Sequence, residues 1–386
     1  MSDAVALARQ LAPAFAARAD VHDRDASVPA EDLADLRSSG LSALMVPESL
    51  GGLGSSFATY AAVARGLAQG NGATALLFNM HCSITGALAS TPDDLARELG
   101  APEGFFSWRD GVLRDAAAGS LFFVAMSERA AGSRFSKMTT TYEREGDGWR
   151  IRGSKTFCSG AGHGDAYLVV ARSTDRSRIS QFLVPASDGV TVERTWDPLG
   201  MRATASNDVH LDVLVDDSAL LGGVEGLAPL LAQALPHWLV ASYAAVYVGV
   251  ARAAIDEAAR QLTERGLHNL PAVRARLGRA DADVEAAWLV TAEAARQVDI
   301  APGTPETNRW VYRAKLLAGD TASRVATSMV EACGTSSTRR GNPLERLFRD
   351  ARCGALHPAT SDVCADWLGA ATLGLDPDND TAVARW

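Results

Sequence analysis

The first part of the chain has the residue spacing of amphipathic helices. In 32–41 (DLADLRSSGL) and 57–70 (FATYAAVARGLAQG), apolar residues recur every three or four positions, and Ala, Leu and Arg are frequent. That period matches one face of an α-helix. Pro29 opens one such run, with Glu31 and Asp32 behind it, as is typical of a first helical turn. The pattern predicts an N-terminal helical domain over residues 1–118.

The pattern changes near Leu121 to short, β-branched segments in which apolar and polar residues partly alternate. Examples are 166–173 (AYLVVARS) and 209–217 (VHLDVLVDD), and Gly-containing turns such as 145–149 (EGDGW) lie between such segments. About seven strands of this kind in about 100 residues are typical of a β-barrel or sandwich. We therefore expect a middle β-domain over residues 119–218.

Helical spacing returns at about Ala219 and continues to about Gly374. The polar segment 375–386 that follows is expected to be a flexible tail. Helix, sheet and helix in this order predict an α+β fold with a C-terminal helical domain over residues 219–374.

One uncharged segment has the length of a membrane span. No charged residue occurs from Leu227 to Ala251. Gln233, Pro236 and His237 interrupt the segment, and a charged helical run begins at Arg252. A helix buried in a bundle or in a subunit interface is therefore the favoured interpretation.

Composition narrows the function classes further. The formal net charge is −9, and no block of Lys and Arg stands out, which argues against nucleic-acid binding. The five cysteines include no CxxC pair, so reduced thiols in a cytoplasm fit better than a disulfide framework or a metal site. The N-terminal residues lack the continuous apolar core of a secretory signal. We expect a cytoplasmic protein without a bound metal.

Four motifs in order carry a family resemblance. The runs 125–133 (AMSERAAGS), 146–162 (GDGWRIRGSKTFCSGAG), 197–206 (DPLGMRATAS) and 342–352 (NPLERLFRDAR) resemble signature segments of the acyl-CoA dehydrogenase family. The resemblance covers almost the whole chain. It implies the acyl-CoA dehydrogenase fold, with an N-terminal helical domain, a middle β-domain and a C-terminal four-helix bundle. It also implies FAD as cofactor and a homotetramer or homodimer.

The resemblance also implies which residues contact the flavin. Phe157 stands where the family has a Trp beside the flavin ring, and Ser159 stands where it has a Thr whose hydroxyl can reach N5. A structural alternative is that Phe157 belongs to the core and Ser159 to a turn. Arg265 retains part of a motif that reaches a neighbouring subunit's FAD, and Gly334 retains part of a Gly-rich cofactor segment. The full implied set of cofactor-binding residues is Met126, Ser127, Ser133, Phe157, Cys158, Ser159, Arg265, Gly334 and Thr360.

The glutamate that serves as the family's catalytic base is missing. Pro358 occupies one of its two known positions, in 356–363 (LHPATSDV), and 234–249 (ALPHWLVASYAAVYVG) contains no carboxylate at the other. Proline cannot accept a proton. His357 is adjacent to the lost glutamate, and His81 lies on a helix that overhangs the flavin in this fold. With Ser159, these are the candidate catalytic residues.

The two histidines also permit structural roles. His81 could satisfy a hydrogen bond in the core, and His357 could cap a helix end. The same pattern of His, His and Ser without Glu resembles the flavin-dependent monooxygenases that share this fold, in which reduced flavin reacts with O2. A histidine with a pKa near 6.5 suits acid–base work or hydrogen bonding at such a site.

Candidate substrate contacts are less specific. Tyr243 and Tyr247 on the apolar helix suggest an apolar or aromatic group, although both could be bundle core. Arg129 and Arg134 replace the Pro and Asp of the first signature. These two cations could meet an anionic substrate tail such as a phosphopantetheine, or both could be solvated.

Two functions follow from these observations. The first is oxidation of an acyl thioester, on CoA or an acyl carrier protein, by a flavin-dependent oxidoreductase with a base other than Glu. The second is a two-component monooxygenase supplied with reduced flavin by a separate flavin reductase. The cofactor motifs around Arg265 and Gly334 are only partly present, so FAD could bind loosely or reduced flavin could act as a co-substrate. A non-redox flavoprotein and an inactive scaffold are the remaining alternatives.

Overall fold

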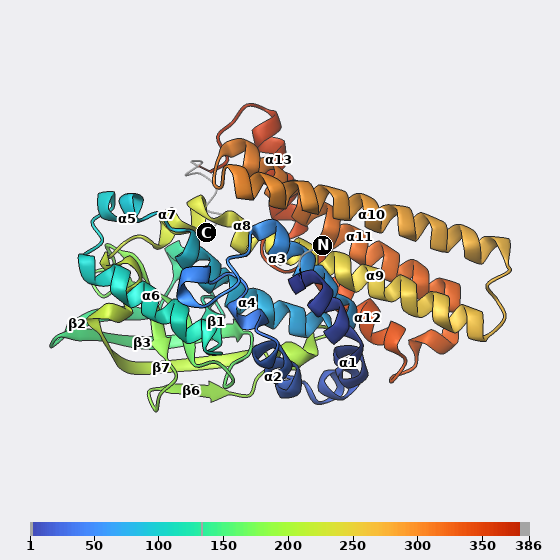
Figure 1. Cartoon of the computed structure of the whole chain (residues 1–386), viewed down its shortest axis with the longest axis horizontal. Helices are drawn as coiled ribbons and strands as arrows, with labels where there is room; N and C mark the ends of the chain where they lie inside the picture. The colour runs from blue at the N-terminus through green and yellow to red at the C-terminus, as the bar shows by residue number, and fades with distance from the viewer. Residues whose placement is uncertain (1–2, 133, 379–386) are drawn as a thin grey trace.

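The computed structural model describes residues 3–132 and 134–378 (Figure 1). Helices occupy the N-terminal part, strands the middle and helices the C-terminal part, so the expected α+β class is confirmed. The last N-terminal helix ends at Ala117 and the first strand begins at Phe122. The last strand ends at Asp216, and the next α-helix begins at Ala228. The division into domains at 118–119 and 218–219 stays a prediction.

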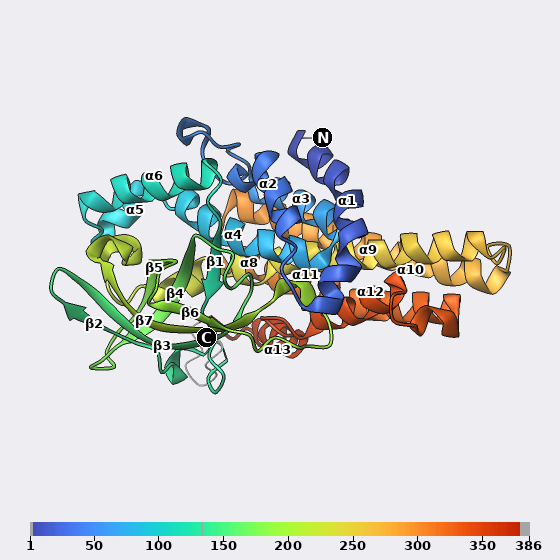
Figure 2. The same cartoon turned by 90° about the horizontal axis from the view of Figure 1, so that it is seen from below.

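The N-terminal part contains six α-helices among the described residues, and Figure 2 shows helices α4 and α6 on one side of the sheet. Helix α4 is buried on nearly all sides because its sequence is almost free of charge. Its first turn is capped by Asn71, whose Oδ1 accepts a hydrogen bond from the Ala73 N–H at 3.0 Å. The six helices are α1 (Asp3–Asp25), α2 (Ala30–Ser38), α3 (Phe57–Gly70), α4 (Gly72–Ser90), α5 (Asp93–Glu98) and α6 (Glu103–Ala117).

The middle part forms one hydrogen-bonded sheet of seven strands within the described residues. The main strand order is β1-β4-β2-β3-β7-β6, and β5 pairs with β4 off this path. Strand β1 runs parallel to β4, whereas the long strands β3 and β7 pair antiparallel. The strands are β1 (Phe122–Ala125), β2 (Thr141–Glu145), β3 (Gly148–Cys158), β4 (Ala166–Ser173), β5 (Ile179–Pro185), β6 (Val190–Glu193) and β7 (Asn207–Asp216).

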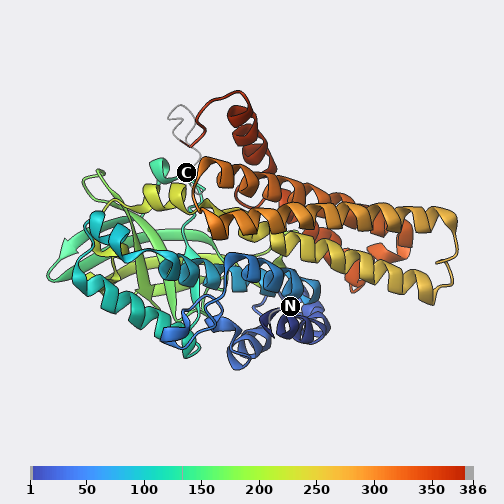
Figure 3. The ribbon, with the colours of Figure 1, turned by 45° about the horizontal axis from the view of Figure 1, so that its top comes forward.

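The C-terminal part is built on three long helices that lie side by side (Figure 3). They are α9 (Ala241–Glu264), α10 (Pro271–Ile300) and α11 (Pro305–Cys333). The short helices α12 (Pro343–Arg352) and α13 (Ser361–Thr372) pack on α11 and complete the expected bundle. Beyond α13, the Asp378 carboxylate accepts a hydrogen bond from Trp367 Nε1 at 2.8 Å. The flexible tail expected over 375–386 stays a prediction. The rest of that tail, 379–386, lies outside the described residues.

The uncharged segment is not one continuous helix. It is divided into α7 (Ala228–Ala234), α8 (Pro236–Leu239) and α9, with Pro236 as the first residue of α8. The stretch 236–264 is long and apolar enough to cross a membrane, but 83% of its most apolar window is buried inside the protein. This burial supports the expected core helix.

Buried ion pairs connect the C-terminal part to the N-terminal part. The Arg349 guanidinium on α12 lies 2.5 Å from the Asp23 carboxylate on α1 and 2.7 Å from Glu345 on its own helix. Arg346 on the same face reaches Asp20 at 2.8 Å. Removing one partner of such a buried pair is strongly destabilising. The RDAR run of the fourth motif therefore fixes α12, and the segment after it, against the rest of the molecule.

Candidate functional site

The ends of strands β1 and β3 bring the first two sequence motifs together. Met126 and Ser127 follow β1 directly, and the Thr156 N–H donates to the Ser127 carbonyl at 2.9 Å. Lys155 Nζ lies 3.3 Å from the Met126 carbonyl oxygen. The Ser127 hydroxyl makes no hydrogen bond that the structure shows among the described residues, and it is half-buried. Two motifs that are well separated in sequence thus form one edge of the site.

A buried ion pair holds this edge in place. Lys155 Nζ lies 2.9 Å from Glu128 Oε1, and both side chains are buried. Burial alone would raise the pKa of Glu128, but Lys155 and hydrogen bonds from Thr139 and Thr140 lower that pKa to about 2. Glu128 is therefore a charged structural anchor.

Phe157 is an exposed aromatic residue on the same edge. Its side chain is 61% exposed, its φ is 56°, and its ring meets Trp196 edge-on with 5.8 Å between centroids. A non-glycine residue in this backbone region is uncommon, and such residues cluster at functional sites. The structural alternative, in which Phe157 belongs to the core, is therefore wrong. Cys158 points the other way and is fully buried, and burial raises its pKa to about 12, so its thiol is not available to a cofactor.

Ser159 begins a chain of hydroxyl groups. Its Oγ lies 2.9 Å from Ser206 Oγ, which lies 2.6 Å from Thr204 Oγ1. Thr204 donates to the Met201 carbonyl at 2.8 Å, and the Met201 N–H donates to the Asp350 carboxylate at 2.6 Å. The second, third and fourth motifs therefore meet through hydrogen bonds. The sequence had indicated no role for Ser206 or Thr204, although both lie in the quoted third motif.

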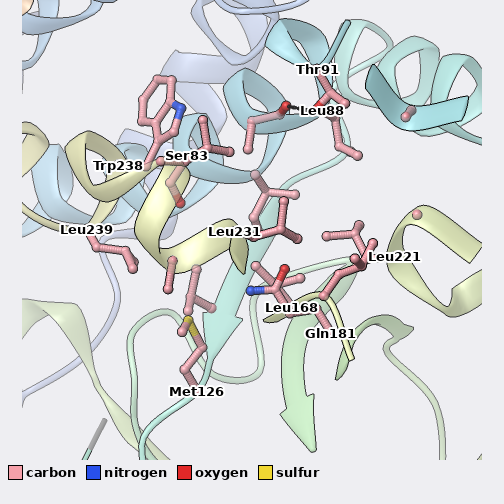
Figure 4. Close-up of a pocket in the computed structure, with 18 of the residues that line it drawn as sticks. Ser83, Leu88, Thr91, Met126, Leu168, Gln181, Leu221, Leu231, Trp238 and Leu239 are labelled. Atoms are coloured by element: carbon pink, nitrogen blue, oxygen red, sulfur yellow. Dashed lines mark hydrogen bonds between the residues drawn. The ribbon is translucent and has the colours of Figure 1, made fainter. Parts of the chain in front are cut away.

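A mostly apolar cavity adjoins Met126 (Figure 4). Its volume is about 110 Å³. Helices α4, α7 and α8 form part of its wall, and the strand side is formed by β1, β4 and β5. Among the described residues no Asp, Glu, Lys, Arg or His lines it. Lining residues labelled in the view include Ser83, Leu88, Thr91, Met126, Leu168, Gln181, Leu221, Leu231, Trp238 and Leu239.

His357 lies just after α12 and is held by Tyr247 of α9. The Tyr247 Oη and His357 Nδ1 are 2.7 Å apart. No other hydrogen bond of Tyr247 is shown among the described residues, and its side chain is fully buried, so the phenol proton has to be donated to Nδ1. This assigns the His357 proton to Nε2, which makes no hydrogen bond within the described part of the chain.

The electrostatic setting of His357 favours its neutral form. Burial, and then the nearby Lys315 ammonium, lower the pKa of His357 to about 3. Burial also raises the pKa of Tyr247 well above its usual range, which keeps the phenol protonated. At neutral pH, His357 is therefore a neutral hydrogen-bond donor through Nε2.

His81 has no ring nitrogen left for a reaction. Its Nε2 lies 2.7 Å from the Ser42 carbonyl oxygen, and its Nδ1 accepts the Phe122 N–H at 3.2 Å. Burial lowers the pKa of His81 to about 4, consistent with a neutral core residue. The expected catalytic role of His81 conflicts with these contacts. The structural alternative, a satisfied hydrogen bond in the core, describes it.

The residues expected to contact the substrate do not line the apolar cavity. Tyr247 supports His357, and Tyr243 is half-buried with its ring edge-on to His357 at 5.8 Å between centroids. Neither tyrosine lines the apolar cavity. Arg134 is exposed, and its Nε donates to the Ala131 carbonyl at 3.3 Å. Contacts of these three residues with a substrate stay predictions.

The remaining expected cofactor residues lie in different parts of the chain. Arg265 Nη1 donates to the Cys333 carbonyl at 2.6 Å, next to Gly334 in the chain, so this contact joins the C-terminal ends of α9 and α11. Figure 1 shows these helix ends far from the sheet. Thr360 caps α13, because its Oγ1 accepts the Val363 N–H at 3.3 Å. Ser133 lies outside the described residues. No group of three or more His, Cys, Asp or Glu suited to a metal occurs in the described ranges.

Comparison with known proteins identifies the family of the chain and its flavin-binding relatives. Family models match three segments: the acyl-CoA dehydrogenase N-terminal domain at 4–94, the middle domain at 124–214 and a C-terminal domain at 241–362. The chain is 30% identical to YdbM of Bacillus subtilis, which is named as a putative acyl-CoA dehydrogenase. The match covers 94% of each protein.

Two solved structures with bound FMN are also similar. The FMN-bound form of TdsC, a dibenzothiophene monooxygenase of Paenibacillus sp. A11-2, has a TM-score of 0.83 at 26% identity and covers 97% of this chain and 98% of its own. KijD3, in complex with FMN and a dTDP-linked amino keto sugar, has a TM-score of 0.85 at 26% identity, with 98% and 96% covered. The chain therefore belongs to the acyl-CoA dehydrogenase family and is a flavin-dependent oxidoreductase.

Proposed function

We propose that this flavin-dependent oxidoreductase is a monooxygenase that uses reduced flavin and O2 on an uncharged, mostly apolar substrate. The observation that carries the proposal is the hydrogen bond between Tyr247 Oη and His357 Nδ1, 2.7 Å long. It makes His357 a donor through Nε2. The alternative reaction, α,β-dehydrogenation, requires a group that accepts the α-proton of the substrate.

The chain offers no such base near the cavity among the described residues. Pro358 replaces one expected glutamate, and no carboxylate lines the cavity. The lone pair on Nδ1 of His357 is used by Tyr247, and Nε2 carries a proton. A group with a pKa of about 3 is also a weak base near pH 7. A neutral N–H donor instead suits stabilisation of negative charge that develops on oxygen.

The described residues fit a flavin ring at the edge formed by β1 and β3. The exposed ring of Phe157 provides an apolar surface for a planar group, and the Ser127 hydroxyl is free to hydrogen-bond. Because Thr204 donates its proton to the Met201 carbonyl, Ser206 donates to Thr204 and Ser159 donates to Ser206. The Ser159 oxygen therefore remains able to accept a hydrogen bond from a flavin. A bound reduced flavin would supply two electrons to O2, so that one oxygen atom enters the substrate and the other leaves as water. We propose that Arg265 contacts the flavin cofactor of a neighbouring subunit and that Gly334 lies near the pyrophosphate or adenosine part of the cofactor.

The cavity supports the proposed substrate class. Its lining is almost entirely aliphatic or aromatic, and it begins at Met126, next to the proposed flavin edge. Binding an isolated charge there would be costly because no opposite charge lines the cavity. We propose a flavin reductase as the partner that supplies reduced flavin, a homotetramer or homodimer as the assembly, and a cytoplasmic location.

Oxidoreduction of an acyl thioester, on CoA or an acyl carrier protein, is the second candidate. The similarity to YdbM and the retained Ser127 and Glu128 of the first motif favour it. This reaction requires either that the His357 proton move from Nε2 to Nδ1, so that Nε2 can act as the base, or that another group act as the base.

A comparison of two reactions tests the proposal. The purified protein receives photoreduced FMN or FAD, ¹⁸O2 and a neutral fused aromatic probe such as indole, and product is analysed by mass spectrometry. Incorporation of one ¹⁸O atom per product supports the monooxygenase. Anaerobic bleaching of bound oxidised flavin by an acyl-CoA, with formation of the enoyl product, would instead establish the second candidate.

A further inference from the structure

Lysine is rare in this chain and occurs at two buried positions. There are three lysines, Lys137, Lys155 and Lys315, among 37 basic residues. Lys137 is exposed, whereas Lys155 and Lys315 are both fully buried. Lys155 is paired with Glu128, as described above. Lys315 has no ion-pair partner among the described residues, so a different reason has to explain a buried ammonium group.

Lys315 donates only to backbone carbonyls of one short segment. Its Nζ lies 2.8 Å from the Gly354 oxygen, 3.1 Å from the His357 oxygen and 2.9 Å from the Ala359 oxygen. An ammonium group has three N–H donors, and these three acceptors use all of them. Burial lowers the pKa of Lys315 only to about 8, so the charged form predominates at pH 7. An arginine, with its planar fork, could not match three acceptors arranged around one point.

The same segment is held by close packing on two sides. A Cβ added to Gly319, one turn beyond Lys315 on α11, would lie 2.6 Å from the Gly354 oxygen. A Cβ added to Gly354 would lie 3.0 Å from the Tyr247 ring. The segment 354–359 therefore lies directly against the backbone of α11 and against the tyrosine that hydrogen-bonds His357.

We propose that Lys315 is a positioning residue: its ammonium group fixes the segment 354–359 so that His357 Nδ1 meets Tyr247 and Nε2 remains free of other hydrogen bonds. The proposal concerns the site of the proposed function, but it is about the state of His357 and does not depend on which flavin reaction occurs. It also explains why a lysine stands here in a chain whose basic residues are mostly arginines.

The test measures the pKa of each histidine separately, through exchange of its C2 hydrogen followed by mass spectrometry. It compares the wild type with Lys315→Met, Gly319→Ala and, as control, Lys137→Met. In Lys315→Met the segment loses all three donors, and the pKa of His357 should rise by about one unit or more as it loses its fixed surroundings. His81 and His237 should keep their values, because only the local segment moves. Lys137→Met should change none of the three.

Gly319→Ala separates position from charge. It leaves the Lys315 ammonium in place but pushes the segment away from α11, so the pKa of His357 should rise here also. A rise in Lys315→Met without one in Gly319→Ala would mean that Lys315 acts through its charge alone, and it would overturn the positioning role. An unchanged His357 in a folded Lys315→Met protein would overturn the proposal outright. If Lys315→Met does not fold, Gly319→Ala decides. None of these readouts requires turnover, so failure of the monooxygenase proposal would be recognised separately.

Discussion

Tyr247 and His357 are joined by a 2.7 Å hydrogen bond between residues that are 110 positions apart in the chain. Tyr247 comes from the long buried helix α9, and His357 from the segment that follows α12. The pair makes one imidazole nitrogen an acceptor and leaves the other as a donor. This turns a side chain that is usually considered as a base into a fixed N–H group.

Substituting Tyr247→Phe should impair the reaction without a large loss of stability. The change removes the hydrogen bond from Tyr247 to the His357 ring, and the proton can then move to Nδ1. We expect turnover to fall by about tenfold or more, on the scale of one lost transition-state donor, and the free energy of unfolding to fall by about 1 kcal/mol. The measurements are steady-state turnover and denaturant unfolding.

Tyr243→Phe is the matched control for that variant. Its ring also meets His357 edge-on, but no hydrogen bond of its hydroxyl is shown among the described residues. Turnover should stay within about twofold of the wild type, which is less than the effect of one hydrogen bond. Equal losses in the two variants would show that packing against His357, and not the hydrogen bond, is what matters.

Two substitutions of His357 distinguish a donor from a base. His357→Ala should lower turnover by about 10²-fold or more, the range expected when a group that acts in the transition state is lost. Gln has an amide N–H that can donate but no basic nitrogen, so His357→Gln should recover part of that loss if His357 is a donor. Turnover of both variants under the same flavin concentration provides the comparison. Equally inactive proteins would favour a base.

Ser159→Ala tests the hydroxyl chain at the proposed flavin edge. The variant removes the partner of Ser206 and the hydroxyl expected near the flavin ring. We expect flavin affinity to fall by about threefold to tenfold, the size of one neutral hydrogen bond, when measured by fluorescence titration. Ser154→Ala on the preceding strand β3 is the control, because its hydroxyl bonds to the exposed His210. Unchanged affinity in Ser159→Ala would remove Ser159 from the flavin site.

The helix–sheet–helix order was predictable because it depends on periodicity within each segment. Regular apolar spacing over 57–70 and alternation over 209–217 each act locally, and the structure places α3 and β7 there. The four motifs were also informative, since the ends of β1 and β3 meet as the family resemblance implied. Local patterns and family motifs therefore located the edge at which we propose that the flavin binds.

The state of the histidines could not be predicted in the same way. Both ring nitrogens of His81 are occupied by hydrogen bonds to Ser42 and Phe122, which lie 39 and 41 positions away, and no local pattern indicates these contacts. The tautomer of His357 depends on Tyr247 in a different helix, and the cavity is lined from three separate parts of the chain. The scarcity of lysine was a signal in the sequence, but its meaning required the position of Lys315.

Replacing His237 should make the protein more resistant to acid. His237 is 3% exposed, its Nδ1 has no hydrogen-bond partner, and burial lowers its pKa to about 3. The native protein therefore keeps this ring neutral while the unfolded chain takes up a proton below about pH 6.5. The stability that it contributes is present above pH 6.5 and is lost as the pH falls toward 3. The loss amounts to about 2 kcal/mol at pH 5.

His237→Phe removes that titration and keeps an aromatic ring against Phe57, whose centroid lies 5.1 Å away. Between pH 7.5 and pH 5, the variant should lose about 2 kcal/mol less unfolding free energy than the wild type. Thermal and denaturant unfolding at both pH values measure this difference. The exposed His268→Phe serves as control and should follow the wild type. A parallel pH dependence in His237→Phe and the wild type would mean that the ring is protonated in the folded protein, because only then does folding leave its pKa unchanged.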